Sequence, residues 1–321
     1  MHISVLLNES IEGLNIKSDG IYVDCTLGRG GHSSEILKRI KRGGYLFAFD
    51  QDKEAINTSK KRLEEIGNNF TIINSNFVNI KKELEVKSIS KVDGILFDLG
   101  VSSPQLDEYE RGFSFHHDAY LDMRMNQENK LSAHDVVNNY SESELVKIFF
   151  EYGEEKYARS IAKAIVNSRK TKPINTTLEL AEVIKSSVPE RVRREKHPAR
   201  KVFQAIRIEV NDELNVLEQA LRDSLDLLNI GGRISVITFH SLEDRIVKNY
   251  FRNLGKQCVC PPEVAVCRCG GRQCAEILTR KPVCPTEAEI KSNSPSRSAK
   301  LRVIRKIKDD TEYHLDGVVG F

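Results

Sequence analysis

The sequence lacks a long hydrophobic run and a recognisable export signal. No stretch reaches the about 18 consecutive apolar residues that a transmembrane helix needs. The segment that starts at Met1 does not show the basic residues followed by an apolar core that typify a signal peptide. We therefore expect no membrane association and a cytoplasmic location.

The sequence also lacks a strong excess of one charge. Its 321 residues include 49 lysines and arginines against 46 aspartates and glutamates, which gives a net charge of +3. A polyanionic partner would have to be bound by a local basic patch, because the global field is weak. The 40% hydrophobic and 30% charged residues are typical of a soluble globular protein with one large domain or two.

Seven cysteines are present, but without an export signal we do not expect disulfides. Six of them lie toward the C-terminus and form two C-x-C pairs followed by two single thiols: Cys258, Cys260, Cys267, Cys269, Cys274 and Cys284. Zinc sites usually show the wider C-x(2–4)-C spacing. A metal-bound loop is an alternative, and we expect reduced thiols and no metal site.

A glycine-rich turn organises the first part of the chain. An apolar strand over residues 21–24 ends at Asp24 and is followed by Gly28-x-Gly30-x-x-Ser33 and an amphipathic helix. A second apolar strand, over residues 45–49, ends at Asp50. This succession of a strand, a glycine turn, a helix and a second strand with an acidic end predicts a nucleotide-cofactor crevice. In such a crevice the carboxylate, here Asp50, accepts hydrogen bonds from a ribose.

The turn favours S-adenosylmethionine over a dinucleotide. A dinucleotide site has a third glycine, so that a pyrophosphate can rest on the helix N-terminus, whereas this chain has Ser33 there. S-adenosylmethionine carries no pyrophosphate but has a sulfonium and an ammonium group, and Asp24 just before the turn suits a cationic ligand. A simple strand-to-helix turn in an unrelated α/β protein is the structural alternative, and Asp50 makes it weaker.

Two further strands place candidate residues at the same edge. Phe77 follows the strand over residues 70–73, where it could stack beside an adenine or fill the core. The strand over residues 92–98 is apolar enough to be central in a parallel sheet and ends at Asp98. Open α/β sheets place their chemistry at such strand ends, which favours a functional Asp98 over a helix cap.

The alternation of strands and helices then stops. Capping boxes at Ser141 and Thr176 and apolar stripes predict several helices and no parallel strand up to about Lys201. This segment reads as a helical insertion that serves as a lid or a substrate-recognition domain. The apolar residues from Phe203 to Leu228 then predict one long helix or two in tandem.

The insertion contains two features that simple packing does not explain. Residues 111–116 and 121–125 mix aromatic side chains and arginines in a loop-like context, and residues 191–201 are densely basic. Such residues contact phosphates and stack on unpaired bases. A solvated basic face is the alternative, but on a nearly neutral protein the run favours RNA or DNA binding.

The chain returns to the sheet after the glycines at 231 and 232. Residues 233–239 predict a fifth strand, followed by His240, for which structural and functional roles are equally open. Residues 277–279 and 301–304 are expected to be the last two strands, paired at one edge of the sheet. We thus predict an α/β fold with a doubly wound, mostly parallel, Rossmann-like sheet and an inserted all-helical domain. Its boundaries are 1–104 and 206–321 for the sheet domain and 105–205 for the insertion.

These motifs resemble the bacterial small-subunit (16S) ribosomal RNA (cytosine-N(4))-methyltransferases, which use S-adenosylmethionine. The resemblance covers nearly the whole chain and rests on residues 2–7, 24–32, 97–107, 111–115, 122–125, 203–208, 238–245 and 297–302. It implies a class I methyltransferase fold and methylation of one cytosine in the ribosomal decoding centre. It also implies cofactor contacts from Gly30, Gly31, His32, Asp50, Phe77, Asp98 and Gln105.

The catalytic hypothesis centres on Asp98, which would accept a hydrogen from the cytosine amine while the nitrogen attacks the methyl group. Ser102, Ser103 or a backbone carbonyl are alternative acceptors. The target base would be turned out of its stack to enter the crevice. The partner would be small-subunit ribosomal RNA or the assembled small subunit, and the sequence leaves the oligomeric state open, a dimer included.

Three other functions compete with this one. A DNA amino-methyltransferase would show a stacking aromatic after the acidic residue, which Asp98-Leu99-Gly100-Val101 lacks. Ser33 and the basic insertion argue against an NAD-dependent oxidoreductase. The third alternative is a non-catalytic RNA-binding assembly factor that keeps the cofactor for structure alone.

Overall fold

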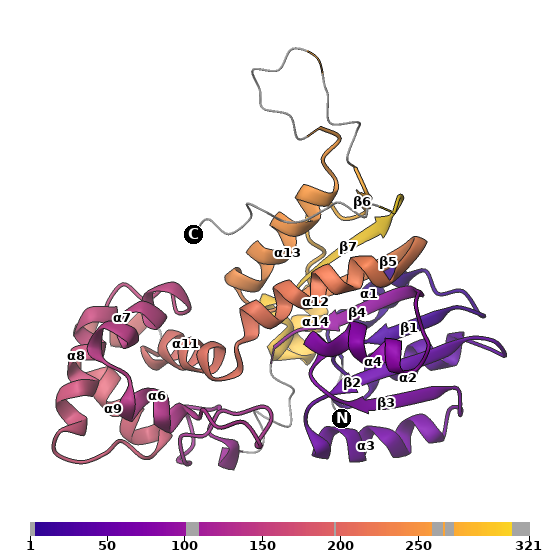
Figure 1. Cartoon of the computed structure of the whole chain (residues 1–321). Coiled ribbons are helices and arrows are strands. Elements are labelled where there is room, and N and C mark those ends of the chain that lie inside the picture. Colours follow the sequence, from indigo (N-terminus) through magenta and orange to yellow (C-terminus); the bar gives the residue numbers. More distant parts are fainter. Residues whose placement is uncertain (1–3, 101–108, 196, 259–265, 267–272, 310–321) are drawn as a thin grey trace. The chain divides into compact units, whose positions relative to one another are not determined.

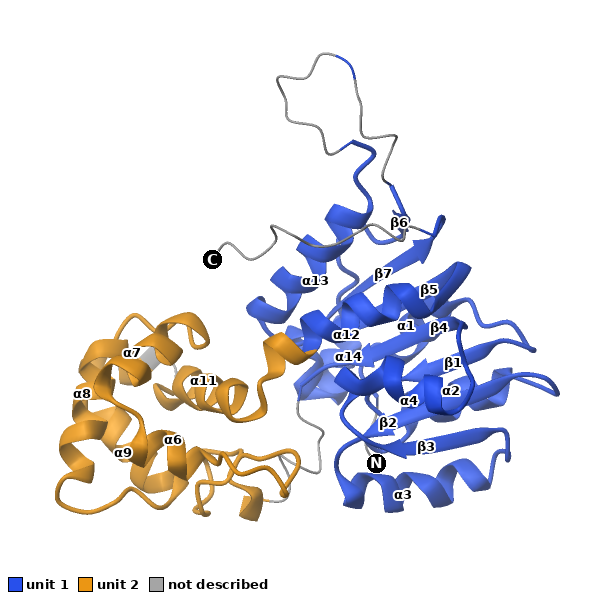
Figure 2. Ribbon diagram, in the orientation of Figure 1, with its two compact units in different colours: residues 1–100, 217–321 blue, residues 101–216 orange. Residues whose placement is uncertain are grey.

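The computed structural model describes residues 4–100, 109–195, 197–258, 266 and 273–309 (Figure 1). The chain divides into two compact units, which Figure 2 shows in different colours. Unit 1 comprises residues 1–100 and 217–321, and unit 2 comprises residues 101–216. The second division falls later in the chain than the expected boundary after residue 205.

Unit 1 is built on a seven-stranded sheet in the order β3-β2-β1-β4-β5-β7-β6. The strands are β1 (Ile21–Asp24), β2 (Tyr45–Asp50), β3 (Phe70–Asn74), β4 (Val92–Asp98), β5 (Leu228–Thr238), β6 (Ala275–Ile277) and β7 (Lys300–Lys306). The first five pair in parallel, and β7 and β6 are antiparallel at one edge. The predicted α/β fold and the paired last two strands are confirmed.

Alternating strand residues bury the sheet on both faces. Phe47, Phe49 and Phe97 belong to one core cluster, whereas Leu46 and Leu96 belong to another. Because side chains alternate along a strand, each face of the sheet needs its own layer of helices. The first cluster contains residues of α4 (Ile80–Val86), α12 (Glu213–Leu227) and α13 (Ser241–Leu254), and the second contains residues of α1 (Leu7–Leu14), α2 (Gly31–Arg39) and α3 (Lys53–Glu64). The smaller elements of this unit are α14 (Glu287–Ser292), η1 (Phe77–Asn79) and η3 (Ser294–Ser298).

Unit 2 is helical in the part that the structure describes. Its elements are η2 (Tyr109–Arg111), α6 (Ala133–Asn139), α7 (Glu142–Glu151), α8 (Ala158–Arg169), α9 (Thr177–Ser186), α10 (Glu190–Glu195) and α11 (Ala199–Asn211). Both expected capping boxes are present, at Ser141 and Thr176, and Ser132 starts α6 with a third. A separate apolar cluster that includes Leu145, Ile161 and Phe203 forms its core.

The apolar stripe that leads back to the sheet is two helices in tandem. Asp212, which separates α11 from α12, has a left-handed φ of 50° that an α-helix cannot continue through. Across this break Arg207 donates two hydrogen bonds of 2.8 Å to the carboxylate of Glu213. The bidentate pair fixes the direction in which the chain leaves α11.

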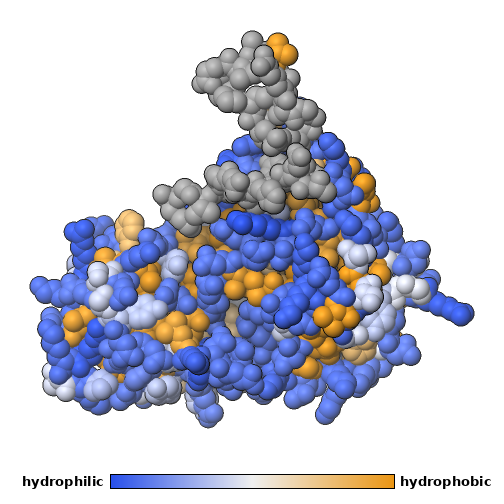
Figure 3. Space-filling model, viewed as in Figure 1, coloured by the Kyte–Doolittle hydropathy of each residue, from blue (hydrophilic) through white to orange (hydrophobic). Residues whose placement is uncertain are grey.

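No described helix is long and apolar enough to cross a membrane. The face drawn in Figure 3 is largely hydrophilic, and its hydrophobic residues form small separate patches.

Candidate active site

Three adjacent strands of unit 1 end in aspartates. Asp24 ends β1, Asp50 ends β2 and Asp98 ends β4. Since β1 lies between β2 and β4 and all three run parallel, the three carboxylates lie side by side at the carboxyl ends of these strands. From here on, the edge means this row of strand ends. This edge is where open parallel sheets bind ligands.

The glycine turn after β1 adopts backbone angles that suit glycine. Gly28 and Gly30 have φ values of 48° and 72°, in the left-handed region. The carbonyl of Gly28 accepts a 2.5 Å hydrogen bond from the Ser59 hydroxyl, and its N–H donates to Asp50 Oδ2 at 2.8 Å. Ser59 of α3 and Asp50 of β2 therefore hold the turn by hydrogen bonds. α2 begins directly after the turn, at Gly31.

Asp24 braces this turn from within. Its side chain is fully buried, with Oδ1 accepting from the Thr26 N–H at 3.0 Å and Oδ2 accepting from the Ser33 hydroxyl at 2.6 Å. Burial raises the pKa of Asp24, and the hydrogen bonds from Ser33 and Thr26 oppose that rise. Both oxygens are thus engaged within the turn, so in this structure Asp24 holds the turn together.

Asp98 has the most unusual surroundings of the three. Its N–H donates to Thr26 Oγ1 at 2.7 Å, which ties the end of β4 to the end of β1. Its Oδ2 lies 3.5 Å from His32 Nδ1, whereas Oδ1 is sealed from solvent and has no hydrogen-bond partner among the described residues. Burial, followed by the charges of Asp24 and Glu243, raises the pKa of Asp98 well above its usual value. The Asp98 carboxylate is therefore more basic than an exposed aspartate and binds a proton more tightly once it accepts one.

Asp50 is partly buried and accepts hydrogen bonds from two backbone N–H groups. Oδ2 accepts from Gly28 and Oδ1 accepts from the Asp52 N–H at 2.9 Å. Burial raises the pKa of Asp50 to about 6 in spite of these two hydrogen bonds. A carboxylate has about four acceptor positions, so Asp50 keeps capacity for hydroxyl donors from a ligand.

Phe77 starts η1 just beyond β3 and is only partly buried. Its ring packs edge-on against Phe97, with 5.6 Å between ring centroids and 87° between ring planes. Phe77 thus packs against the core cluster at the edge that carries the aspartates. Gln105, Ser102 and Ser103 lie outside the described residues.

His240 has a structural role at the start of α13. It is the N-cap residue of a capping box, in which Glu243 accepts hydrogen bonds from the N–H groups of Phe239 and His240. His240 Nε2 lies 3.1 Å from Glu243 Oε1. The Glu243 N–H in turn donates to His240 Nδ1, which completes the cap of α13.

The described cysteines contain no disulfide. They are Cys25, Cys258, Cys274 and Cys284, of which the first and third are buried. Cys260, Cys267 and Cys269 lie outside the described residues.

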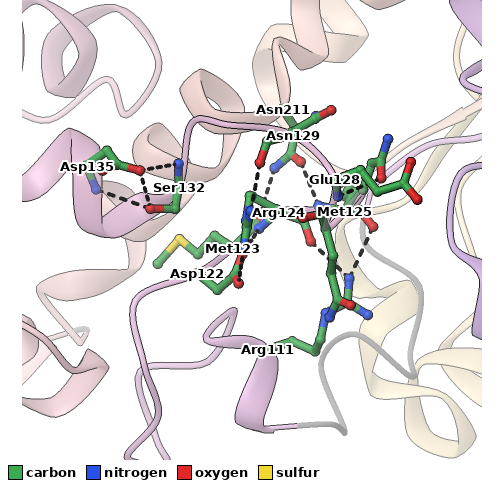
Figure 4. Close-up of polar contacts among 12 residues, drawn as sticks. Arg111, Asp122, Met123, Arg124, Met125, Glu128, Asn129, Ser132, Asp135 and Asn211 are labelled. Atoms are coloured by element: carbon green, nitrogen blue, oxygen red, sulfur yellow. Dashed lines mark hydrogen bonds and ion pairs between the residues drawn. The ribbon is translucent and has the colours of Figure 1, made fainter.

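A second polar centre lies in unit 2, where side chains hold the backbone of the 122–129 loop (Figure 4). Arg124 binds both carboxylate oxygens of Asp122, at 2.7 and 2.8 Å, and donates to two backbone carbonyls of the same loop. The buried Arg111 donates to the carbonyls of Arg124 and Met125. Asn211 from α11 accepts from the Met125 N–H and donates to the Met123 carbonyl, each at 2.8 Å.

Sequence reasoning overlooked several residues that position these two sites. Thr26 and Ser33 lie inside the glycine motif, so their closeness to Asp24 was a usable signal. Ser59 and Asn211 act from the middle and the end of distant helices. Nothing in the local pattern singles out these last two, because they meet their partners only through the tertiary fold.

Comparison with known proteins agrees with the resemblance seen in the sequence. A model of the MraW methylase family matches residues 1–307. Ribosomal RNA small subunit methyltransferase H from Finegoldia magna is 56% identical over 308 residues, which cover 95% of this chain and 98% of the relative. Relatives of the same name from Clostridioides difficile and Fusobacterium nucleatum are 55% and 53% identical and cover 95% and 96% of this chain and 99% and 98% of their own length. The chain belongs to the MraW methylase family.

Proposed function

We propose that this protein transfers the methyl group of S-adenosylmethionine to the exocyclic N(4) amine of a cytosine in small-subunit ribosomal RNA. Family membership and the names of the relatives support the methyl transfer and the class of RNA. The observation that carries the proposal is the sealed Oδ1 of Asp98 at an edge lined by three carboxylates. A substrate of this kind implies work in the cytoplasm.

The residues at this edge fit S-adenosylmethionine. The ligand carries sulfonium and ammonium charges, and carboxylates whose pKa values are raised gain from a cation nearby. We assign its binding to Gly30, Gly31, His32, Asp50, Phe77, Asp98 and Gln105. In this assignment Asp50 accepts from the ribose hydroxyls and Phe77 flanks the adenine. When bound, the ligand supplies an electrophilic methyl group.

Asp98 is the group we assign to the amine. A cytosine amine is a poor nucleophile, because its lone pair is delocalised into the ring, and it improves when an acceptor takes one of its hydrogens. The pKa of Asp98 is raised, so this carboxyl can retain the proton that the amine gives up. Two contacts position Asp98. His32 Nδ1 lies 3.5 Å from its Oδ2, and the Thr26 hydroxyl accepts a hydrogen bond from its backbone N–H. Ser102, Ser103 or a backbone carbonyl stay as alternative acceptors.

The test is methyl transfer from labelled S-adenosylmethionine to three substrates: naked ribosomal RNA, assembled small subunits and duplex DNA. We expect label at N(4) of a cytosine in small-subunit RNA, in the naked or the assembled form. Label in duplex DNA would identify a DNA amino-methyltransferase. A protein that binds the donor and RNA without transfer to any substrate would be a non-catalytic assembly factor, and the proposal would be wrong.

A further inference from the structure

Two sequence features of unit 2 meet in the structure. The aromatic segment contributes Phe115 and His116, and the basic segment (residues 191–201) contributes His197. The ring of Phe115 stacks on that of His197, with centroids 4.5 Å apart and planes inclined by 18°. His116 lies 4.4 Å from Phe115 and 5.7 Å from His197. We call Phe115, His116 and His197 the ring cluster.

The ring cluster is anchored on one side and open on the other. Phe115 packs edge-on against the buried Phe203 of α11 and belongs to the margin of the apolar core. His116 and His197 are exposed to solvent. Fixed rings with exposed faces can stack on further rings at little cost in side-chain entropy.

The backbone that carries the ring cluster is held in place. Gly112, three residues before Phe115, has a φ of 73°, and a Cβ there would lie 2.3 Å from the carbonyl oxygen of Tyr120. Directly before it, the buried Arg111 is bonded to the 122–129 loop drawn in Figure 4. The segment is therefore positioned before any partner arrives.

The chain on either side of His197 is rich in positive charge. The basic segment holds six arginines and lysines against one glutamate, in a chain whose net charge is only +3. Arg191, Arg193, Arg194 and Arg200 are exposed. Arg194 is paired with Glu190, and Glu182 faces His197, so the patch is partly balanced by acids but remains basic.

His197 contributes its ring face more than its charge. Burial, His116 and Lys185 lower the pKa of His197, against a smaller opposite effect of Glu182. The imidazole is then neutral near pH 7, and the attraction for phosphate comes from the arginines.

We propose that the ring cluster and the exposed arginines beside it bind unpaired nucleotides of the RNA substrate by base stacking and phosphate contacts. Single-stranded nucleic acid is recognised by stacking platforms next to basic grooves, whereas a duplex hides its base faces. The proposal rests on the proposed function, because it assigns the RNA contact of that reaction to this surface of unit 2.

The experiment uses the full-length protein and a fluorescent single-stranded RNA of about twelve nucleotides, with its duplex form for comparison. Binding is followed by fluorescence anisotropy at several salt concentrations. The ring variant is His116→Ala with His197→Ala, since Phe115 supports the core. The charge variant is Arg194→Glu with Arg200→Glu. Its matched control is Lys41→Glu with Arg42→Glu. These two exposed basic residues precede the amino end of β2, whereas the glycine turn follows the carboxyl end of β1.

We expect the ring variant to bind the single strand at least about fivefold more weakly, the lower end of losses from one stacked base. It should bind the duplex as the unsubstituted protein does. The charge variant should lose about tenfold or more and show a shallower salt dependence, by about 0.7 per lost phosphate contact. The control should bind normally, and all variants should bind S-adenosylmethionine normally by calorimetry.

Three outcomes would overturn the inference. If the ring variant lost equal affinity for the single strand and the duplex, the surface would bind RNA by electrostatic attraction alone and not by stacking. If both variants bound the single strand with unchanged affinity, this surface would not be an RNA-binding site. Normal binding of the single strand with lost methylation of assembled subunits would assign the surface to a protein partner. Methyl transfer by the unsubstituted protein, measured in parallel, shows whether the proposed function itself has failed.

Discussion

The strand-end carboxylates of unit 1 and the partly buried Asp122–Arg124 pair of unit 2 differ in how their charges are balanced. In unit 1, burial raises the pKa values of Asp24, Asp50 and Asp98. In unit 2, burial acts on Asp122 in the same direction, but hydrogen bonds from Arg124 outweigh it and lower the pKa of Asp122. The difference indicates that the first edge gains by receiving a cation, whereas the second site is already balanced by its own arginines and serves to hold a loop.

The largest effect should come from Asp98→Asn, which keeps the shape of the side chain and removes its proton acceptor. We expect methyl transfer to fall by about 100-fold or more, within the range for loss of a general base. Burial disfavours the ionised carboxyl, so a neutral amide should leave the melting temperature at about pH 8 unchanged or higher. Near-normal single-turnover transfer with bound donor would exclude Asp98 from the chemistry.

Asn211→Ala tests the polar network of unit 2 that holds the 122–129 loop. The substitution removes the hydrogen bonds to Met123 and Met125 and leaves buried backbone groups without partners. We expect a loss of about 2 kcal/mol in the free energy of unfolding and weaker transfer to RNA. Donor affinity measured by calorimetry should stay normal, because Asn211 belongs to unit 2 and the donor residues to unit 1. A variant that lost donor binding but kept its stability would contradict this division of roles.

Asp50 gives the pH dependence of the unit 1 edge. Its pKa of about 6 means that the carboxylate is ionised above that pH and protonated below it. Ribose hydroxyls donate to the ionised form, so affinity for S-adenosylmethionine should be full at about pH 8 and fall roughly tenfold toward pH 5. In Asp50→Asn the affinity should be weak and nearly flat with pH. An equally steep decline in that variant would assign the titration to another group.

The smallest effect should come from Ser141→Ala, which removes the N-cap of α7 in unit 2. We expect a loss of about 1 kcal/mol in the free energy of unfolding, measured by urea titration. Asp52→Ala removes the matching N-cap of α3 in unit 1. Comparable losses in both, with methyl transfer unchanged in Ser141→Ala, would show that unit 2 acts through its surface and its loop network. A loss of transfer in Ser141→Ala would instead implicate α7 itself.

Periodicity and turn chemistry were enough to predict the sheet, its acidic strand ends and the helical insertion. Those features are local, because an apolar run ending at Asp98 or a capping box at Ser141 is readable within a few residues. Sequence reasoning had placed Asp24 toward the ligand, whereas both of its oxygens are bonded to Thr26 and Ser33. The Asn211 contacts and the stacking of Phe115 on His197 join residues more than 80 positions apart. Such pairs depend on tertiary packing, for which a single sequence carries no local signal.

The place of β4 in the sheet has a consequence for how the protein is made. β4 pairs with β5, but about 130 residues, most of them in unit 2, separate Asp98 from Leu228. At about 5–20 residues per second, translation therefore leaves the outer edge of β4 without its neighbour for roughly ten seconds. Unit 2 is continuous in sequence and is complete before β5 emerges. During that interval an apolar edge strand is open to mispairing, so the yield of this enzyme should depend on chaperones that shield nascent chains.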